Sequence, residues 1–256
     1  MATDEIAIAA GVAYMAQQLF GKTLAEMGDD INKVYKANRD KLLAKAASKV
    51  TNPDDGAKPN LRVARDVIWN GAVTDDEVCA EYFGGLLAAS RSAEGKDDSA
   101  LIYVDCIKAL SSKQLHLHFA IYSSLNALLI KAGKAVNPGM QSEFGQSAVY
   151  FAVHELTDRL DLNPVIDLNV LHRQGLIGGY STNNHPVSDQ VLPYAKVNPT
   201  TFGVLLYAAA LNSLTTWQSF GNAEFTHSAQ ISIPEFYAAT IADLCAIIGV
   251  SPPLQS

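Results

Sequence analysis

Residues 74–130 read TDDEVCAEYFGGLLAASRSAEGKDDSALIYVDCIKALSSKQLHLHFAIYSSLNALLI and carry three consecutive segments with helical spacing of apolar residues. The third segment, Lys113–Ala132, is apolar on nearly all sides, which predicts a buried position at the centre of a helical bundle. Gly133 follows it and suits the left-handed residue that ends a helix. In the first segment, Gly84 and Gly85 predict that another helix packs closely there.

Each of these segments also carries a start signal. Thr74 followed by Glu77 predicts a capping box for the first helix, because hydroxyl and carboxylate can each accept from a free backbone N–H. Asp98 can cap the second helix, and Ser111 or Ser112 the third. The acidic start of the first helix needs no catalytic role, since carboxylates there complement the helix dipole.

The N-terminal part of the chain predicts a helical arm. Residues 5–20 suit an apolar helix and Thr23–Lys49 a longer amphipathic one. The segment TNPDDGAKP (51–59) has two prolines, a glycine and paired aspartates, which predicts a loop. We therefore expect an N-terminal hairpin or arm over 1–50 and a central helical bundle over 59–135.

Residues 145–256 are expected to form a winged-helix-like C-terminal region packed on the bundle. The predicted order is helix, helix, short strand, turn, return strand and helix, which is the order of a winged helix-turn-helix. Gly175 can end the second helix in the left-handed region, so that Leu176 and Ile177 enter a strand. The fold class is therefore mainly α, a helical bundle with a winged-helix-like part carrying a small β-hairpin. The expected segments are helices over 145–160, 164–174 and 202–214, strands near 175–180 and over 191–197, a lone strand over 225–233 and a final helix over 234–248.

The composition predicts a cytoplasmic protein with an acidic surface. A net charge of -7 and a pI near 5.3 argue against broad binding to nucleic acid or anionic membranes, because phosphate attraction needs a basic face. The apolar run 6–19 is shorter than the roughly 20 residues that cross a bilayer. Cys79, Cys106 and Cys245 lack the spacing of a zinc motif, so we expect buried free thiols in a reducing compartment.

Three stretches carry a family resemblance. They are the first helix with its acidic start and small-residue end (DDE…EYFGGLLAAS, 75–90), the loop GKDDSA (95–100) and the helix end LSSKQ (110–114). With these, residues 74–122 resemble part of the bacterial abortive-infection alpha (Abi-alpha) family, a domain of unknown function associated with phage defence. The winged-helix-like stretch 171–214 fits the way such proteins continue. The resemblance implies a defence role and supplies no active-site residues.

His154 and Asp158 form a candidate metal site. They lie four residues apart on a predicted helix, so both side chains face the same side. His154-Glu155 begins like a zinc-protease motif, but Asp158 stands where that motif needs its second histidine. A metal-dependent hydrolase with a site near these two residues is one alternative function. His116 and His118 point to different sides of a helix and are interpreted as core or interface histidines.

Residues 161–174 would be the recognition helix of a winged helix-turn-helix. The candidate nucleic-acid contacts on it and beside it are Arg159, His172 and Arg173. Residues 153–214 carry three basic residues against five acidic ones, which disfavours DNA or RNA as a partner. A winged-helix nucleic-acid-binding regulator is nevertheless a second alternative function.

The resemblance to the Abi-alpha family implies a non-enzymatic bacterial defence protein, which acts in abortive phage infection by binding another protein. A membrane partner is disfavoured by the acidic balance, and no small-molecule ligand or cofactor is evident from the motifs. Ile6, Val12 and Phe20 belong to an apolar surface that two helices cannot bury alone. We therefore also expect the arm to self-associate, most simply as a two-fold dimer.

Overall fold

The computed structural model describes residues 23–52, 54–187, 190–222, 225 and 236–249. Within these ranges the chain forms ten α-helices, a four-stranded antiparallel sheet and a two-stranded one. The expectation of a helical chain with an antiparallel hairpin is therefore confirmed. The elements are α2 (Thr23–Ser48), β1 (Lys58–Pro59), α3 (Leu61–Gly71), α4 (Glu77–Ala89), β2 (Arg91–Ser92), α5 (Leu101–Lys108), α6 (Ser112–Ala132), α7 (Gln141–Phe144), β3 (Val149–Ala152), α8 (Val153–Leu160), α9 (Pro164–Arg173), β4 (Ile177–Val187), β5 (Gln190–Pro199), α10 (Thr201–Ala210), the 3-10 helix η1 (Trp217–Ser219), β6 (Tyr237–Ala238) and α11 (Ile241–Ile247).

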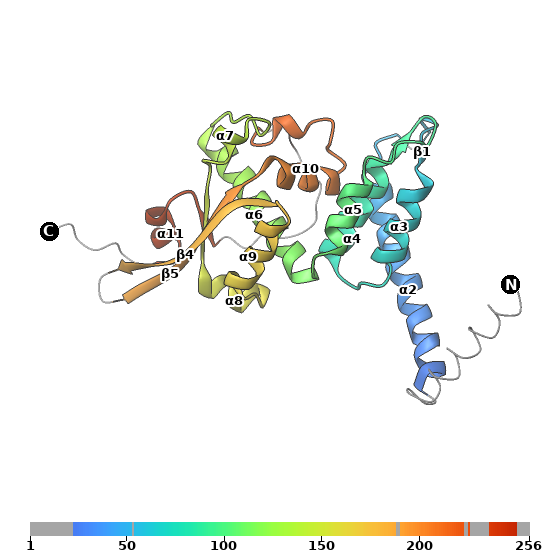
Figure 1. Cartoon of the computed structure of the whole chain (residues 1–256), viewed down its shortest axis with the longest axis horizontal. Helices are drawn as coiled ribbons and strands as arrows, with labels where there is room; N and C mark the ends of the chain where they lie inside the picture. The colour runs from blue at the N-terminus through green and yellow to red at the C-terminus, as the bar shows by residue number, and fades with distance from the viewer. Residues whose placement is uncertain (1–22, 53, 188–189, 223–224, 226–235, 250–256) are drawn as a thin grey trace, which may run out of the picture.

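The helices α2 to α5 gather at one end of the molecule, and the four-stranded sheet lies at the other (Figure 1). Helices α6 and α10 lie between the two ends. One continuous cluster of buried apolar side chains runs from Leu42 on α2 to Phe236 beside β6. The two ends therefore share a core.

Helix α4 is the most buried element of the N-terminal end, with every residue over 78–88 buried. Helices α2 and α3 cover one side of it and α10 packs on another. The two glycines of α4 permit both approaches. A Cβ at Gly84 would lie 3.0 Å from the backbone nitrogen of Ala46, and one at Gly85 would lie 2.7 Å from Cα of Ala210. The close packing predicted from these glycines is confirmed.

Helix α6 occupies the predicted central position. It contacts α4 on one side and α9 on another, and most of its residues are buried. Ser111 and Gln114 form a capping box at its start, and Gly133 ends it with a φ of 59°. Both end signals read from the sequence are confirmed. Of the described helices, α6 included, none has the length and apolar character that crossing a membrane requires.

Two predicted caps are wrong. Helix α4 begins at Glu77 and is capped by Asp76, which accepts a hydrogen bond from the backbone N–H of Cys79, so Thr74 lies outside it. Helix α5 has no side-chain cap. The carboxylate of Asp98 instead binds the guanidinium of Arg62 at 2.8 Å and ties α3 to the loop before α5.

The predicted helix over 145–160 is also wrong in its first half. Residues 149–152 form strand β3, which pairs antiparallel with 194–197 of β5 and with 237–238 of β6. Helix α8 starts at Val153, directly after the strand. A four-residue strand has too few residues to show alternation, and its pairing partners lie far along the chain.

The hairpin predicted between residues 175 and 200 is confirmed, and it extends further than expected. Gly175 has a φ of 71° and leads from α9 into β4, as predicted. β4 pairs with β5 from Ile177↔Pro199 to Val187↔Gln190, and the four-stranded sheet has the order β4-β5-β3-β6.

The two faces of the sheet are covered by different helices. Val149 and Phe151 belong to the main core with residues of α6, α8 and α9. On the other face, Ala152 and Leu192 pack with Leu244 of α11. Both faces of the sheet are therefore covered where β3 and β5 pair.

The final helix begins later than predicted. It starts at Ile241 with Thr240 as its cap, and Tyr237–Ala238 is a strand instead of helix. The sequence around Pro234 favoured an earlier start, but pairing with β3 takes residues 237 and 238 into the sheet. The predicted helix over 5–20 lies outside the described residues, as does the predicted strand over 225–233 except for Phe225.

The three cysteines are free and buried, as predicted. Burial raises the pKa of Cys79 to about 12 and that of Cys106 to about 11. Thiols with such pKa values stay protonated at neutral pH and are poor nucleophiles.

The two histidines near the start of α6 have different partners, the cap of α4 for His116 and a residue within α4 for His118. Nε2 of His116 lies 2.8 Å from Oδ2 of Asp76, whereas Nδ1 of His118 lies 2.5 Å from the hydroxyl of Tyr82. Partial burial raises the pKa of Asp76, but hydrogen bonds from His116 and the backbone N–H of Cys79 outweigh this effect and lower that pKa to about 2. Full burial lowers the pKa of His118 to about 3.

Acidification is expected to destabilise the fold through His118. The unfolded chain binds a proton on this imidazole near pH 6.5, whereas the folded chain leaves it neutral down to about pH 3. The unfolded state therefore binds more protons in this window. The free energy of unfolding should fall by up to about 1.4 kcal/mol for each pH unit below about pH 6. Urea unfolding at a series of pH values measures this slope.

The control for this prediction is His118→Gln, which keeps a polar side chain but cannot titrate. The carboxylates contribute equally to the pH dependence of both proteins, so the difference between the two slopes isolates the imidazole. The slope of the variant should be flatter. Equal slopes between about pH 6 and pH 4 would contradict the prediction.

Candidate functional site

We call the surface formed by α8, α9 and the β4–β5 hairpin the hairpin site. Helix α8 ends at Asp161, which adopts the left-handed conformation with a φ of 50°. Asn163 then caps α9 by accepting a hydrogen bond from the backbone N–H of Ile166, and Pro164 occupies the first turn. Leu168 is buried in the core, so the opposite side of α9 faces solvent.

The first turn of α9 exposes two large apolar side chains. Val165 is 57% exposed and Ile166 is 59% exposed. Asn169, one turn further along, is exposed as well. Two neighbouring branched aliphatic side chains are therefore exposed in one turn of the helix.

The last turn of α9 carries two of the predicted nucleic-acid contacts, His172 and Arg173, and both are exposed. The ring of His172 packs edge-on against Tyr180 of β4 at 6.0 Å between centroids. The Tyr180 hydroxyl accepts a hydrogen bond from Nδ2 of Asn169 at 3.1 Å. These contacts fix the end of α9 against the start of the hairpin.

The third predicted nucleic-acid contact, Arg159, has other partners. It lies on α8, forms an ion pair with Glu155 and holds its guanidinium 5.5 Å from the ring centroid of Phe236. Among the described residues, no hydrogen bond or ion pair joins Arg159 to His172 or Arg173. Two of the three predicted residues therefore lie together at the end of α9, and the third lies on α8 against Phe236.

The predicted metal pair, His154 and Asp158, lies one turn apart on α8, and both residues are exposed. Nε2 of His154 lies 3.6 Å from a carboxylate oxygen of Glu155. Within the described part of the chain, no group of three or more His, Cys, Asp or Glu side chains could hold a metal ion. The described residues give this pair no third ligand.

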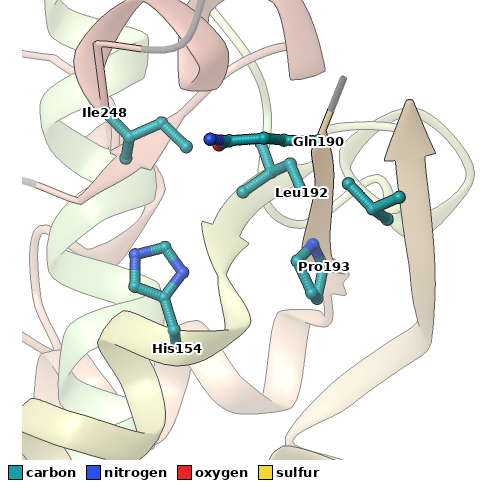
Figure 2. Close-up of a pocket in the computed structure, with 6 residues that line it drawn as sticks. His154, Gln190, Leu192, Pro193 and Ile248 are labelled. Atoms are coloured by element: carbon teal, nitrogen blue, oxygen red, sulfur yellow. The ribbon is translucent and has the colours of Figure 1, made fainter. Parts of the chain in front are cut away.

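His154 instead lines a hollow of about 310 Å³ next to the hairpin. Figure 2 shows its ring rising from α8 into the space between Ile248 and the strand that carries Leu192 and Pro193. Four of its six lining residues have apolar side chains, but polar atoms form the larger part of the exposed lining. Gln190 and the imidazole supply the polar side-chain groups. It is lined by His154, Gln190, Val191, Leu192, Pro193 and Ile248.

A second hollow, of about 250 Å³, lies between the start of α9 and the hairpin. Its walls include Val165 on α9 and Asn184 on β4, and Pro193 belongs to both hollows. The exposed patch on α9 therefore continues into a concave surface with polar, uncharged side chains. The lining residues are Val153, Pro164, Val165, Thr182, Asn183, Asn184 and Pro193.

The charges around α9 do not form a basic face. Asp161 at the end of α8 forms an ion pair with Lys113 of α6. Asp167 accepts hydrogen bonds from the side chain of Gln114 and the backbone N–H of Asn163. Two carboxylates thus flank the first turn of α9, where a phosphate would meet repulsion.

The exposed apolar residues of this site are not among the predicted site residues. The prediction for α9 rests on the charge balance of residues 153–214, which carries no information on Val165 or Ile166. One local signal was present for Ile166, which lies two positions before Leu168 and five before Leu171 and is out of step with these buried residues. Val165 lies three positions before Leu168, a helical spacing that gives no such signal.

No protein-family model, no curated protein and no solved structure matches this chain.

Proposed function

We propose that this chain is a non-enzymatic bacterial defence protein that acts in abortive phage infection by binding another protein through the exposed face of α9. The defence role rests on the resemblance of residues 74–122 to the Abi-alpha family. The binding mode rests on the hairpin site. The two parts of the proposal are tested separately below.

The observation that carries the binding mode is the exposure of Val165 and Ile166 in the first turn of α9. Branched apolar side chains that a helix presents to solvent gain by burial against a second protein surface. The two hollows beside the hairpin make that surface concave, so that side chains of a partner can insert into them. Protein interfaces commonly combine an apolar centre with a polar rim, here Asn169, Asn183 and Asn184.

The order of the elements supports a winged-helix-like arrangement. A strand, two helices and a long hairpin follow one another as β3, α8, α9, β4 and β5, with β3 next to β5 in the sheet. In that arrangement α9 takes the place of the recognition helix. The exposed residues of its first turn are apolar, so this helix is better suited to a protein surface than to phosphates.

A phage assay tests both parts of the proposal. Expression of the chain in a phage-sensitive host should reduce plaque counts relative to an empty vector. Ile166→Asp should return the counts to the empty-vector level, because a carboxylate at the centre of the contact loses solvation without a partner. The substitution should leave α9 folded, since a negative charge near a helix start is favourable.

The matched control is Ile102→Asp on α5. The exposed fraction of Ile102 is 60%, similar to the 59% of Ile166. Its helix, α5, lies at the other end of the molecule (Figure 1). This variant should protect like the unchanged chain. Protection by Ile166→Asp would contradict the role of α9, whereas unchanged plaque counts with the unaltered chain across a broad phage panel would contradict the defence role.

A mobility-shift titration with DNA and RNA at low salt separates this proposal from its main alternative. A nucleic-acid reader would show salt-sensitive binding that Arg173→Ala and Arg159→Ala weaken. We expect no shift, because two carboxylates flank the start of α9 and Arg159 is paired with Glu155. A shift that Arg173→Ala abolishes would indicate that α9 binds nucleic acid, and it would contradict the proposal of protein binding.

A further inference from the structure

Strand β4 is a long open edge of the four-stranded sheet. It has 11 residues and, among the described strands, pairs only with β5. The opposite edge, β6, has 2 residues. An edge strand of this length presents a row of backbone N–H and C=O groups that can pair with another strand.

The register identifies the residues whose backbone groups point outward. Val187 pairs with Gln190 across the two residues that join the strands. Such a closing pair is hydrogen-bonded, and hydrogen-bonded pairs alternate with non-bonded pairs along an antiparallel ladder. Val187, His185 and Asn183 therefore direct their backbone groups toward β5. The residues that direct theirs outward are Tyr180, Thr182, Asn184 and Pro186.

Two prolines agree with this assignment, because proline has no N–H and cannot donate to a ladder. Pro186 stands at an outward position. Pro193 lies opposite Asn184 in a non-bonded pair, so its nitrogen faces away from β4. On the side of β5 that faces away from β4, pairing with β3 ends at Tyr194, so Pro193 lies beyond the last paired residue.

The outward edge carries two of the usual protections against pairing, Pro186 near its end and a register shift between Ile177 and Gly179. Between these positions the other protections, a charged side chain or a helix or loop bonded to the edge, are not found among the described residues. Residues 177–187 contain no Asp, Glu, Lys or Arg. Thr182, Asn183 and Asn184 are all exposed, and among the described residues no hydrogen bond to the outward backbone groups of Thr182 or Asn184 is found.

We propose that β4 pairs antiparallel with β4 of a second copy of this chain around a two-fold axis near Thr182. Two copies can meet here without like charges opposite each other, because the strand is uncharged, although the chain as a whole carries -7. The short β6 edge cannot pair with β4 over its length, so sheet pairing between copies uses β4 twice and closes as a dimer. This dimer does not depend on the proposed function. Its contact is the strand edge, which shares Thr182 and Asn184 with the second hollow of the hairpin site.

Sedimentation of the full chain tests the dimer. We expect twice the monomer mass of 27.4 kDa at high concentration, with dissociation on dilution. Thr182→Pro removes the outward N–H and leaves the bonds to β5 intact. The two-fold axis doubles the loss, so the dimer should weaken by at least about tenfold. Thr182→Ala is the control, because it removes the side chain and keeps the N–H, and it should dimerise like the unchanged chain.

Amide hydrogen exchange on the unchanged chain provides a readout that needs no variant. The N–H groups of Thr182 and Asn184 should exchange more slowly at dimer concentrations than at monomer concentrations, while that of His185, already directed at β5, should not change. A monomer at all concentrations would overturn the proposal. So would a dimer that leaves these two amides unprotected, or one that both Thr182→Pro and Asn184→Pro leave intact in a folded state.

Discussion

Glu81→Ala is expected to lower the free energy of unfolding by roughly 3–5 kcal/mol. Glu81 lies on α4, where its side chain is 3% exposed and forms ion pairs with Lys45 on α2 and with Lys49 directly after that helix. The side chain of Lys49 is 2% exposed. Removing the carboxylate leaves this ammonium buried without a counter-charge, which costs far more than the loss of an exposed pair. Urea unfolding at neutral pH measures the difference.

Glu77→Ala provides the matched control, one turn earlier on the same helix. Glu77 also forms ion pairs with two lysines of α2, Lys41 at 3.1 Å and Lys45 at 3.3 Å, but its side chain is 58% exposed. Solvent screens these pairs, so the variant should lose less than about 1 kcal/mol. Similar losses in the two variants would contradict the importance of burial at Glu81.

Gly85→Ala is expected to destabilise the chain by about 3 kcal/mol or more. Helix propensity alone predicts the opposite sign, a gain of about 1 kcal/mol for replacing glycine inside a helix. The added Cβ would lie 2.7 Å from Cα of Ala210 and still closer to its carbonyl group. Backbone atoms cannot rotate away, so α4 and α10 would have to separate. Thermal and urea unfolding both measure this effect.

Gly179→Ala controls for the substitution itself, because a Cβ at Gly179 meets no atom within 4 Å. Its stability should stay within about 1 kcal/mol of the unchanged chain. A gain of stability at Gly85 would show that α4 and α10 do not approach each other as closely as described.

The features that could be predicted from the sequence are those with local causes. Helix α6 is fixed by a capping box at Ser111 and a left-handed glycine at its end, all within one segment of chain. The turn at Gly175 and the approach of another helix at Gly85 depend on the small size of glycine, which is visible in a single residue.

The features that escaped prediction depend on distant partners. Strand β3 exists because residues 194–197 and 237–238 lie on either side of it. The start of α4 at Asp76 is stabilised by His116, 40 positions later. The same holds for the candidate site, since the exposure of Val165 depends on how α9 is seated on the core. Propensity and periodicity describe neighbours in sequence and carry no information on these contacts.

The contact between Gly85 and Ala210 has a consequence for biosynthesis. The two residues are separated by about 125 positions, and a ribosome adding roughly 5–20 residues per second needs about 6–25 s to synthesise that interval. Throughout this time the side of α4 that will contact α10 stays uncovered, because α10 has not yet been synthesised. We therefore expect the nascent chain to be most prone to aggregation in the interval before α10 is synthesised.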